Sequence, residues 1–148
     1  MPFSAAAAAL LGLGFLLTAQ NFLPPPPSLA QTLQANRGQK RLLLVAAPTA
    51  GQAAFQAQKA QLAASQAGLN ERDFLVLDVL YDQLSAADRQ FLTRRLGLRP
   101  PAFAAVLIGK DGEVKLRSAR PLAPAALFAT VDQMPMRRQE MRRAAPRQ

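Results

Sequence analysis

Residues 41–52 of this 148-residue chain read RLLLVAAPTAGQ, and this stretch decides the fold. It begins with an apolar run that lacks polar alternation, which is typical of a strand buried on both faces of a sheet. Pro48 closes this strand. Thr49 and Gln52 then stand three residues apart, the spacing of a capping box at the start of a helix. The stretch therefore predicts a buried strand that leads through a short loop into a helix.

Three further strands are predicted downstream. The segments 74–80 (FLVLDVL) and 103–108 (FAAVLI) are again continuous apolar runs. The segment 113–117 alternates between charged and apolar residues, and the turn at 110–112 (KDG) joins it to the preceding strand as a hairpin. Strands joined through a helix are expected to run parallel, and the hairpin adds one antiparallel pair.

Helices are predicted between and after these strands. The first should run to about Ala67, with Gly68 as its left-handed C-cap. The second begins at Ser85 and ends at Gly97, and the last begins at Pro124. The order is β-α-β-α-β-β-α, a small mixed sheet flanked by helices. This α/β arrangement is typical of the thioredoxin-like fold.

The N-terminal segment has the features of a secretory signal. Residues 1–30 carry no charged side chain, and residues 5–19 form a nearly unbroken apolar run. Fifteen helical residues rise about 22 Å, which is short for a membrane span but suits a signal peptide. Cleavage is expected between Ala30 and Gln31, with Ala19–Gln20 as the second candidate, while an uncleaved anchor or an unfolded apolar tail is the alternative. We predict a periplasmic or secreted protein without a transmembrane anchor after cleavage.

The chain contains no cysteine and no histidine, and this excludes several kinds of chemistry. Thioredoxin-like enzymes place a thiol in the loop after the first strand, where a helix N-terminus favours the thiolate. Residues 47–52 hold no thiol, so disulfide exchange and peroxide reduction are excluded. Neither a metal nor a cofactor is predicted. Thr49 and Gln52 are candidates for helix capping or ligand contact, and Pro101, if cis, would shape a groove for an extended peptide.

The export signal and the thiol-free loop predict an exported, non-redox binding or structural module. The alternatives are an enzyme based on carboxylate or hydroxyl groups and an accessory factor that binds extended peptides in the groove near Pro101. Asp78 and Asp82 lie four residues apart, but a strand leading into a loop does not bring such a pair onto one face. Together with Thr49 they are the candidates for the enzymatic alternative. We predict that the protein is not an enzyme.

Basic side chains are concentrated at the C-terminus. The chain has a net charge of +9, and residues 137–148 hold five arginines against one acid, Glu140. The candidate binding residues in this segment are Arg137, Arg138, Arg142 and Arg143. They could bind an anionic envelope surface or an acidic protein partner, or belong to a solvated extension. Nucleic acid is not an expected partner, since the chain lacks spare aromatic residues for stacking.

Several segments resemble one family of small exported bacterial proteins. They are RLLLVAAPTA at 41–50, ERDFLVLDV at 71–79, VLIGKDGEVKLRSARPL at 106–122 and MPMRRQEMRR at 134–143. They resemble the domain of unknown function 4174, a related form of which occurs in secreted sushi-repeat and equarin-type proteins. The resemblance implies a thioredoxin-like fold and export, and no catalytic residues. We predict a signal peptide (1–30), a linker (31–40), a thioredoxin-like domain (41–136) and a basic tail (137–148).

Overall fold

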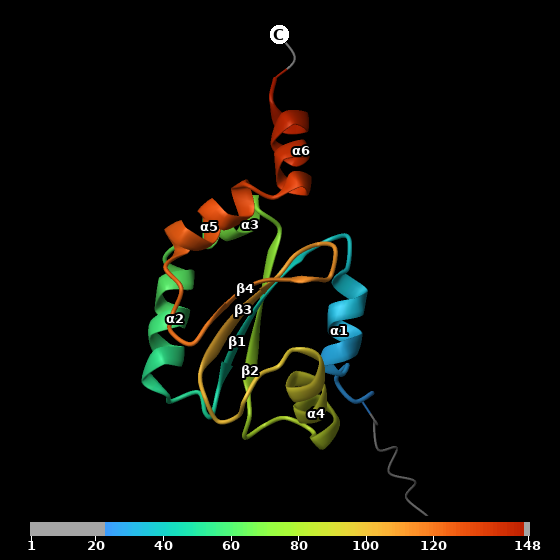
Figure 1. Cartoon of the computed structure of the whole chain (residues 1–148), viewed down its shortest axis with the longest axis vertical. Helices are drawn as coiled ribbons and strands as arrows, with labels where there is room; N and C mark the ends of the chain where they lie inside the picture. Colours follow the sequence, from blue (N-terminus) through green and yellow to red (C-terminus); the bar gives the residue numbers. More distant parts are fainter. Residues whose placement is uncertain (1–22, 147–148) are drawn as a thin grey trace, which may run out of the picture.

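The computed structural model, which describes residues 23–146, contains a four-stranded sheet with helices on both faces (Figure 1). The strands lie in the spatial order β2-β1-β3-β4. Their bounds are β1 (Arg41–Ala47), β2 (Phe74–Leu80), β3 (Ala104–Ile108) and β4 (Val114–Ser118). The predicted α/β fold class, a small mixed sheet flanked by helices, is confirmed.

The direction of β3 differs from the prediction. β1 and β2 are parallel, but β3 is antiparallel to β1 as well as to β4, so the sheet has two antiparallel pairs. Ala104 in β3 is the register partner of Ala46 in β1, so the chain enters β3 at the sheet end where β1 and β2 finish. The intervening helix returns the chain to this end without crossing the sheet.

The helices form two layers around the strands (Figure 1). Their bounds are α1 (Leu29–Asn36), α2 (Ala53–Ala63), α3 (Gln66–Glu71), α4 (Ala86–Arg95), α5 (Pro124–Asp132) and α6 (Pro135–Ala144). Leu43 and Val45 of β1 pack in the core with α2, α3 and α5, whereas Leu42 and Leu44 pack with α1 and α4. All four are buried, as the continuous apolar run predicts.

Gly68 does not end a helix, contrary to the prediction. α2 stops at Ala63, and Gly68 lies inside the separate short helix α3. Left-handed glycines are found instead at Gly97 (φ 64°), where α4 ends, and at Gly112 (φ 85°) in the β3–β4 hairpin. The absence of a side chain at Gly68 leaves room for the ring of Phe128 from α5.

The N-terminal boundary also differs from the prediction. Much of the expected linker, residues 31–40, belongs to helix α1. Ser28 and Gln31 form a capping box there, and the buried Leu29 donates its backbone N–H to Asp88 Oδ1 of α4 at 2.9 Å. Most of the expected signal peptide (1–22) lies outside the described residues, but cleavage after Ala30 would divide α1. Within residues 23–146, no helix has the length and hydropathy needed to cross a membrane.

Candidate functional site

The loop after β1, where a thioredoxin-like enzyme carries its nucleophile, ends in a helix cap. Gln52 is the N-cap of α2, and its side-chain oxygen accepts the backbone N–H of Phe55 at 3.2 Å. Thr49 is exposed, and its carbonyl oxygen accepts the backbone N–H of Gln52 at 3.3 Å. The predicted capping box beginning at Thr49 is therefore wrong, because α2 begins at Ala53 and Gln52 caps it alone.

Pro101 belongs to the same end of the sheet. It precedes β3 by three residues, and the Pro100–Pro101 peptide bond is cis. Because β3 starts beside the end of β1, the topology brings Pro101 to the sheet end that carries Thr49 and Gln52. The sequence-predicted group of Thr49, Gln52 and Pro101 thus shares one end of the molecule.

Of the carboxylates considered for an enzyme, Asp82 lies beside the loop that carries Thr49, because its backbone N–H donates to the Pro48 carbonyl oxygen at 3.2 Å. Asp78 is exposed on β2 and pairs with Lys59 of α2 at 2.8 Å. Asp82 is also exposed, in the turn after β2. Within the described part of the chain, no cluster of three or more acidic side chains could hold a metal ion.

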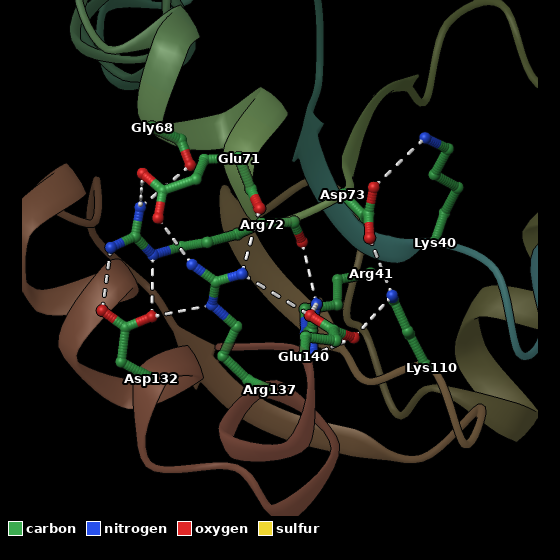
Figure 2. A network of polar contacts seen from close by, with 10 residues as sticks. All are labelled: Lys40, Arg41, Gly68, Glu71, Arg72, Asp73, Lys110, Asp132, Arg137 and Glu140. Atoms are coloured by element: carbon green, nitrogen blue, oxygen red, sulfur yellow. Dashed lines mark hydrogen bonds and ion pairs between the residues drawn. The ribbon is translucent and has the colours of Figure 1, made fainter. Parts of the chain in front are cut away.

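At the opposite end of the sheet, ion pairs connect α6 to the strands (Figure 2). Arg41, the first residue of β1, is 1% exposed and pairs with both carboxylate oxygens of Glu140 at 3.1 Å. Lys110, just after β3, donates to Glu140 at 2.6 Å and to Asp73 at 2.8 Å. One α6 carboxylate therefore neutralises two buried cations that come from separate parts of the sheet.

Arg137 extends this network to α3 and α5 (Figure 2). Its guanidinium, although buried, pairs with Glu71 at 2.6 Å, Asp132 at 3.2 Å and Glu140 at 3.6 Å. Arg72 binds Asp132 through two bonds of 2.9 and 2.8 Å. The predicted binding residue Arg137 is thus occupied inside the protein, where it fastens α6 to the domain.

The network also shifts the pKa values of its carboxylates. The hydrogen bond from Lys110 lowers the pKa of Asp73, and the hydrogen bond from Arg72 lowers that of Asp132. Burial alone would raise the pKa of Glu140, but hydrogen bonds from Arg41 and Lys110 outweigh it and the pKa lies below its ordinary value. All three groups are therefore ionised at neutral pH and hold their cationic partners.

The exposed residues of α6 outside this network form a separate surface, which we call the α6 face. It consists of Met136, Arg138, Met141, Arg142 and Arg143, all of which are exposed. Met136 is 42% and Met141 38% exposed, and within residues 23–146 no ion pair involves the three arginines. The predicted tail therefore begins as an ordered helix, which projects from the domain (Figure 1).

The sequence patterns do not predict the ion-pair network that joins Arg41, Asp73, Lys110 and Glu140. Arg41 carries a signal, because it is a charged residue directly beside an apolar run that predicts a buried strand, whereas Lys110 falls in the predicted turn at 110–112 and carries none. A cation at such a position needs an anionic partner. That partner lies thirty or more residues away, so no local motif reveals it.

Comparison with curated proteins identifies animal relatives. The chain is 34% identical over 113 residues to the human and rat "Sushi repeat-containing protein SRPX", and 33% identical to the mouse protein. The matched region is 69% of this chain but 24% of the length of each relative. The similarity therefore concerns one domain of a longer protein.

A solved structure with a similar fold is the reduced 2-Cys peroxiredoxin of Plasmodium vivax. The TM-score is 0.54 at 16% sequence identity, over 74% of this chain and 84% of the peroxiredoxin chain. At this identity the likeness concerns the fold alone, which is thioredoxin-like. The model of the family described as "Domain of unknown function (DUF4174)" matches residues 32–140, from α1 to the middle of α6. The chain belongs to the DUF4174 family.

Proposed function

We propose that this protein is an exported, non-catalytic binding module that docks to an acidic protein partner through the α6 face. The observation that supports this most is that the charged residues of α6 fall into a buried set and an exposed set. Arg137 and Glu140 are engaged in the buried network, whereas Arg138, Arg142 and Arg143 point their charges at solvent. A helix fixed at its base presents these three cations in a defined arrangement.

The composition of the α6 face favours a protein partner over a lipid surface. Methionine and arginine are both enriched in protein interfaces, and methionine adapts its shape to varied apolar surfaces. Met141 lies in an open hollow together with Arg138 and Arg142. An apolar side chain of the partner would fit over Met141, while neighbouring carboxylates pair with the planar guanidinium groups.

The loop after β1 supports the non-catalytic part of the proposal. It holds neither a thiol nor an imidazole, and Gln52 serves as a helix cap there. In addition, the Asp78 carboxylate is engaged in an ion pair with Lys59 at 2.8 Å. Binding through the α6 face, by contrast, requires only side chains that the chain contains.

Neutralising the arginines of the α6 face should weaken binding to an acidic polypeptide. For the variant R138Q/R142Q/R143Q we expect about tenfold weaker binding to immobilised poly-L-glutamate at physiological salt, a loss of about 1.4 kcal/mol. The matched control is R89Q/R94Q/R95Q, which removes three exposed arginines from α4. The control should bind within about twofold of the natural chain.

Two results would overturn this assignment. Equal losses in both variants would mean that binding follows net charge and involves no particular surface. A loss on anionic vesicles of phosphatidylglycerol, without a loss on poly-L-glutamate, would identify a lipid surface as the partner. Both variants change solvent-exposed side chains, so their unfolding midpoints should stay close to that of the natural chain.

Export predicts a specific mature N-terminus. Cleavage after Ala30 would remove the capping residue Ser28 and the buried Leu29, whereas cleavage after Ala19 leaves all of α1 intact. We therefore expect protein recovered from the periplasm of an expressing bacterium to begin at Gln20. Intact-mass measurement and N-terminal sequencing check this, and a chain that begins at Gln31 or that keeps Met1 contradicts it.

A further inference from the structure

The outer edge of β2 carries backbone groups that face away from the sheet. β2 is the last strand in the spatial order and pairs on one side, with β1. Arg41 donates its backbone N–H to the Asp73 carbonyl oxygen at 2.9 Å. Tyr81 donates its backbone N–H to the Ala47 carbonyl oxygen, also at 2.9 Å. In a parallel ladder such bonds recur at every second residue, so the backbone groups of the alternate residues of β2 point outward. These residues are Phe74, Val76, Asp78 and Leu80.

The two central residues of this set keep their hydrogen-bonding groups free. The Leu80 carbonyl oxygen accepts the backbone N–H of Gln83 at 3.0 Å. Within residues 23–146, by contrast, no backbone or side-chain group bonds the outward N–H and C=O of Val76 or Asp78. A free row of donors and acceptors along an edge is a template for another strand.

The side chains of β2 do little to protect this edge. The strand is seven residues long, and its register with β1 is regular throughout. Six of the seven residues are apolar, and the charge of the seventh, Asp78, is neutralised by Lys59 at 2.8 Å. The edge is therefore regular, apolar and locally neutral, although the whole chain has a net charge of +9.

We propose that β2 pairs with β2 of a second copy of this chain in antiparallel orientation, which joins two four-stranded sheets into one. Pairing about Leu77 places Val76 of one copy opposite Asp78 of the other, and Phe74 opposite Leu80. Outward-facing backbone groups then meet outward-facing groups at each of these positions. The strand meets itself about a twofold axis, so the assembly closes as a dimer.

The distribution of charge favours a second copy in this orientation. Each edge brings a neutral Lys59–Asp78 pair, and each ammonium can also attract the carboxylate of the other copy. α6 lies at the sheet end where β1 and β2 begin, since Glu140 binds Arg41 (Figure 1). Antiparallel pairing therefore sets the two α6 faces at opposite ends of the dimer, where their arginines repel each other least.

Sedimentation equilibrium of the purified chain between about 5 and 500 μM tests whether this dimer forms. We expect a dissociation constant of about 50 μM, because pairing through one strand edge buries less than the roughly 1,200 Å² of a stable interface. Hydrogen exchange followed by NMR locates the contact. The amides of Val76 and Asp78 should exchange about threefold more slowly at about 500 μM than at about 20 μM. A chain that stays monomeric over this range, or a dimer that leaves both amides unprotected, would overturn the proposal.

A pair of lysine variants separates pairing at this edge from general charge effects. Asp78→Lys places a second cation beside Lys59, where the other copy brings the same two cations, and should weaken dimerisation at least tenfold. Asp82→Lys makes the same charge change at an exposed position beyond the paired segment, and dimerisation should stay within twofold. Equal effects of the two substitutions would contradict the proposal. The R138Q/R142Q/R143Q variant should dimerise like the natural chain, so dimerisation and binding of an acidic partner can fail separately.

Discussion

Replacement of Glu140 by glutamine should destabilise the fold by about 3 kcal/mol, the loss expected when one partner of a buried ion pair is removed. Glu140 is the carboxylate that Arg41 and Lys110 share, and both cations are buried. Glutamine has nearly the same shape but no charge, so Arg41 loses its carboxylate partner and Lys110 keeps only Asp73. The urea midpoint of unfolding, measured at pH 7 by circular dichroism, should fall accordingly.

Glu113→Gln is the matched control for this experiment. The Glu113 side chain is 76% exposed and pairs with Lys115 at 3.2 Å on the surface of the hairpin. Exposed pairs of this kind contribute less than about 1 kcal/mol. A similar loss of stability in the two variants would mean that the α6 network contributes no more than an ordinary surface pair.

The same network should make the natural protein sensitive to acid. The pKa values of Asp73, Asp132 and Glu140 are lowered in the folded state, so folding favours their ionised forms. Their contribution is complete above the unfolded pKa values, near 4, and is lost as the pH falls through the lower folded values. Stability should therefore decrease below about pH 5, and Glu140→Gln should show a shallower decrease. Parallel pH profiles for the two proteins would contradict this assignment.

Gly68→Ala should destabilise the protein by about 1–3 kcal/mol, the range for an overpacked core. In an ordinary helix this change stabilises by about 0.5–1 kcal/mol, because alanine restricts the unfolded chain. Here the new Cβ would stand 2.5 Å from Cε2 and 2.8 Å from Cζ of Phe128. That ring packs against Phe74 at 6.3 Å and lies under the guanidinium of Arg72 at 4.5 Å, so it has little freedom to move away.

Two further variants test this explanation. Gly51→Ala is the control, because its Cβ would meet only the Thr49 hydroxyl at 3.9 Å, an ordinary contact. The double variant G68A/F128L should regain part of the lost stability, since leucine removes the ring that causes the clash. An unfolding midpoint for Gly68→Ala at or above that of the natural chain would show that Phe128 gives way.

The strands could be predicted from the sequence because each is bounded by clear local signals. The apolar runs at 41–46 and 74–80 have no polar alternation, and Gly112 supplies the positive φ of the hairpin. The antiparallel direction of β3 could not be predicted in this way. It depends on which sheet end the chain reaches after α4, and several loop conformations are compatible with the same residues.

Helix boundaries and the network were harder to predict for a different reason. A glycine at position 68 is compatible both with the end of a helix and with close packing against Phe128. Only the tertiary contact with Phe128 distinguishes these two roles. The sequence predicts a basic C-terminal segment. Which of its arginines is buried (Arg137) and which is exposed (Arg138) depends on where α6 contacts Glu71 and Asp132. Those partners are set by the fold.

The outer edge of β4 has a consequence for assembly. β4 is an edge strand of five residues, and its exposed positions carry the cations Lys115 and Arg117. The adjoining ladder is irregular at Leu107/Ile108, where a bulge interrupts the register. Short length, positive charge and a bulge each discourage another molecule from adding a strand to a sheet. This edge should therefore resist intermolecular sheet extension and amyloid-like association, even when the protein accumulates at high concentration.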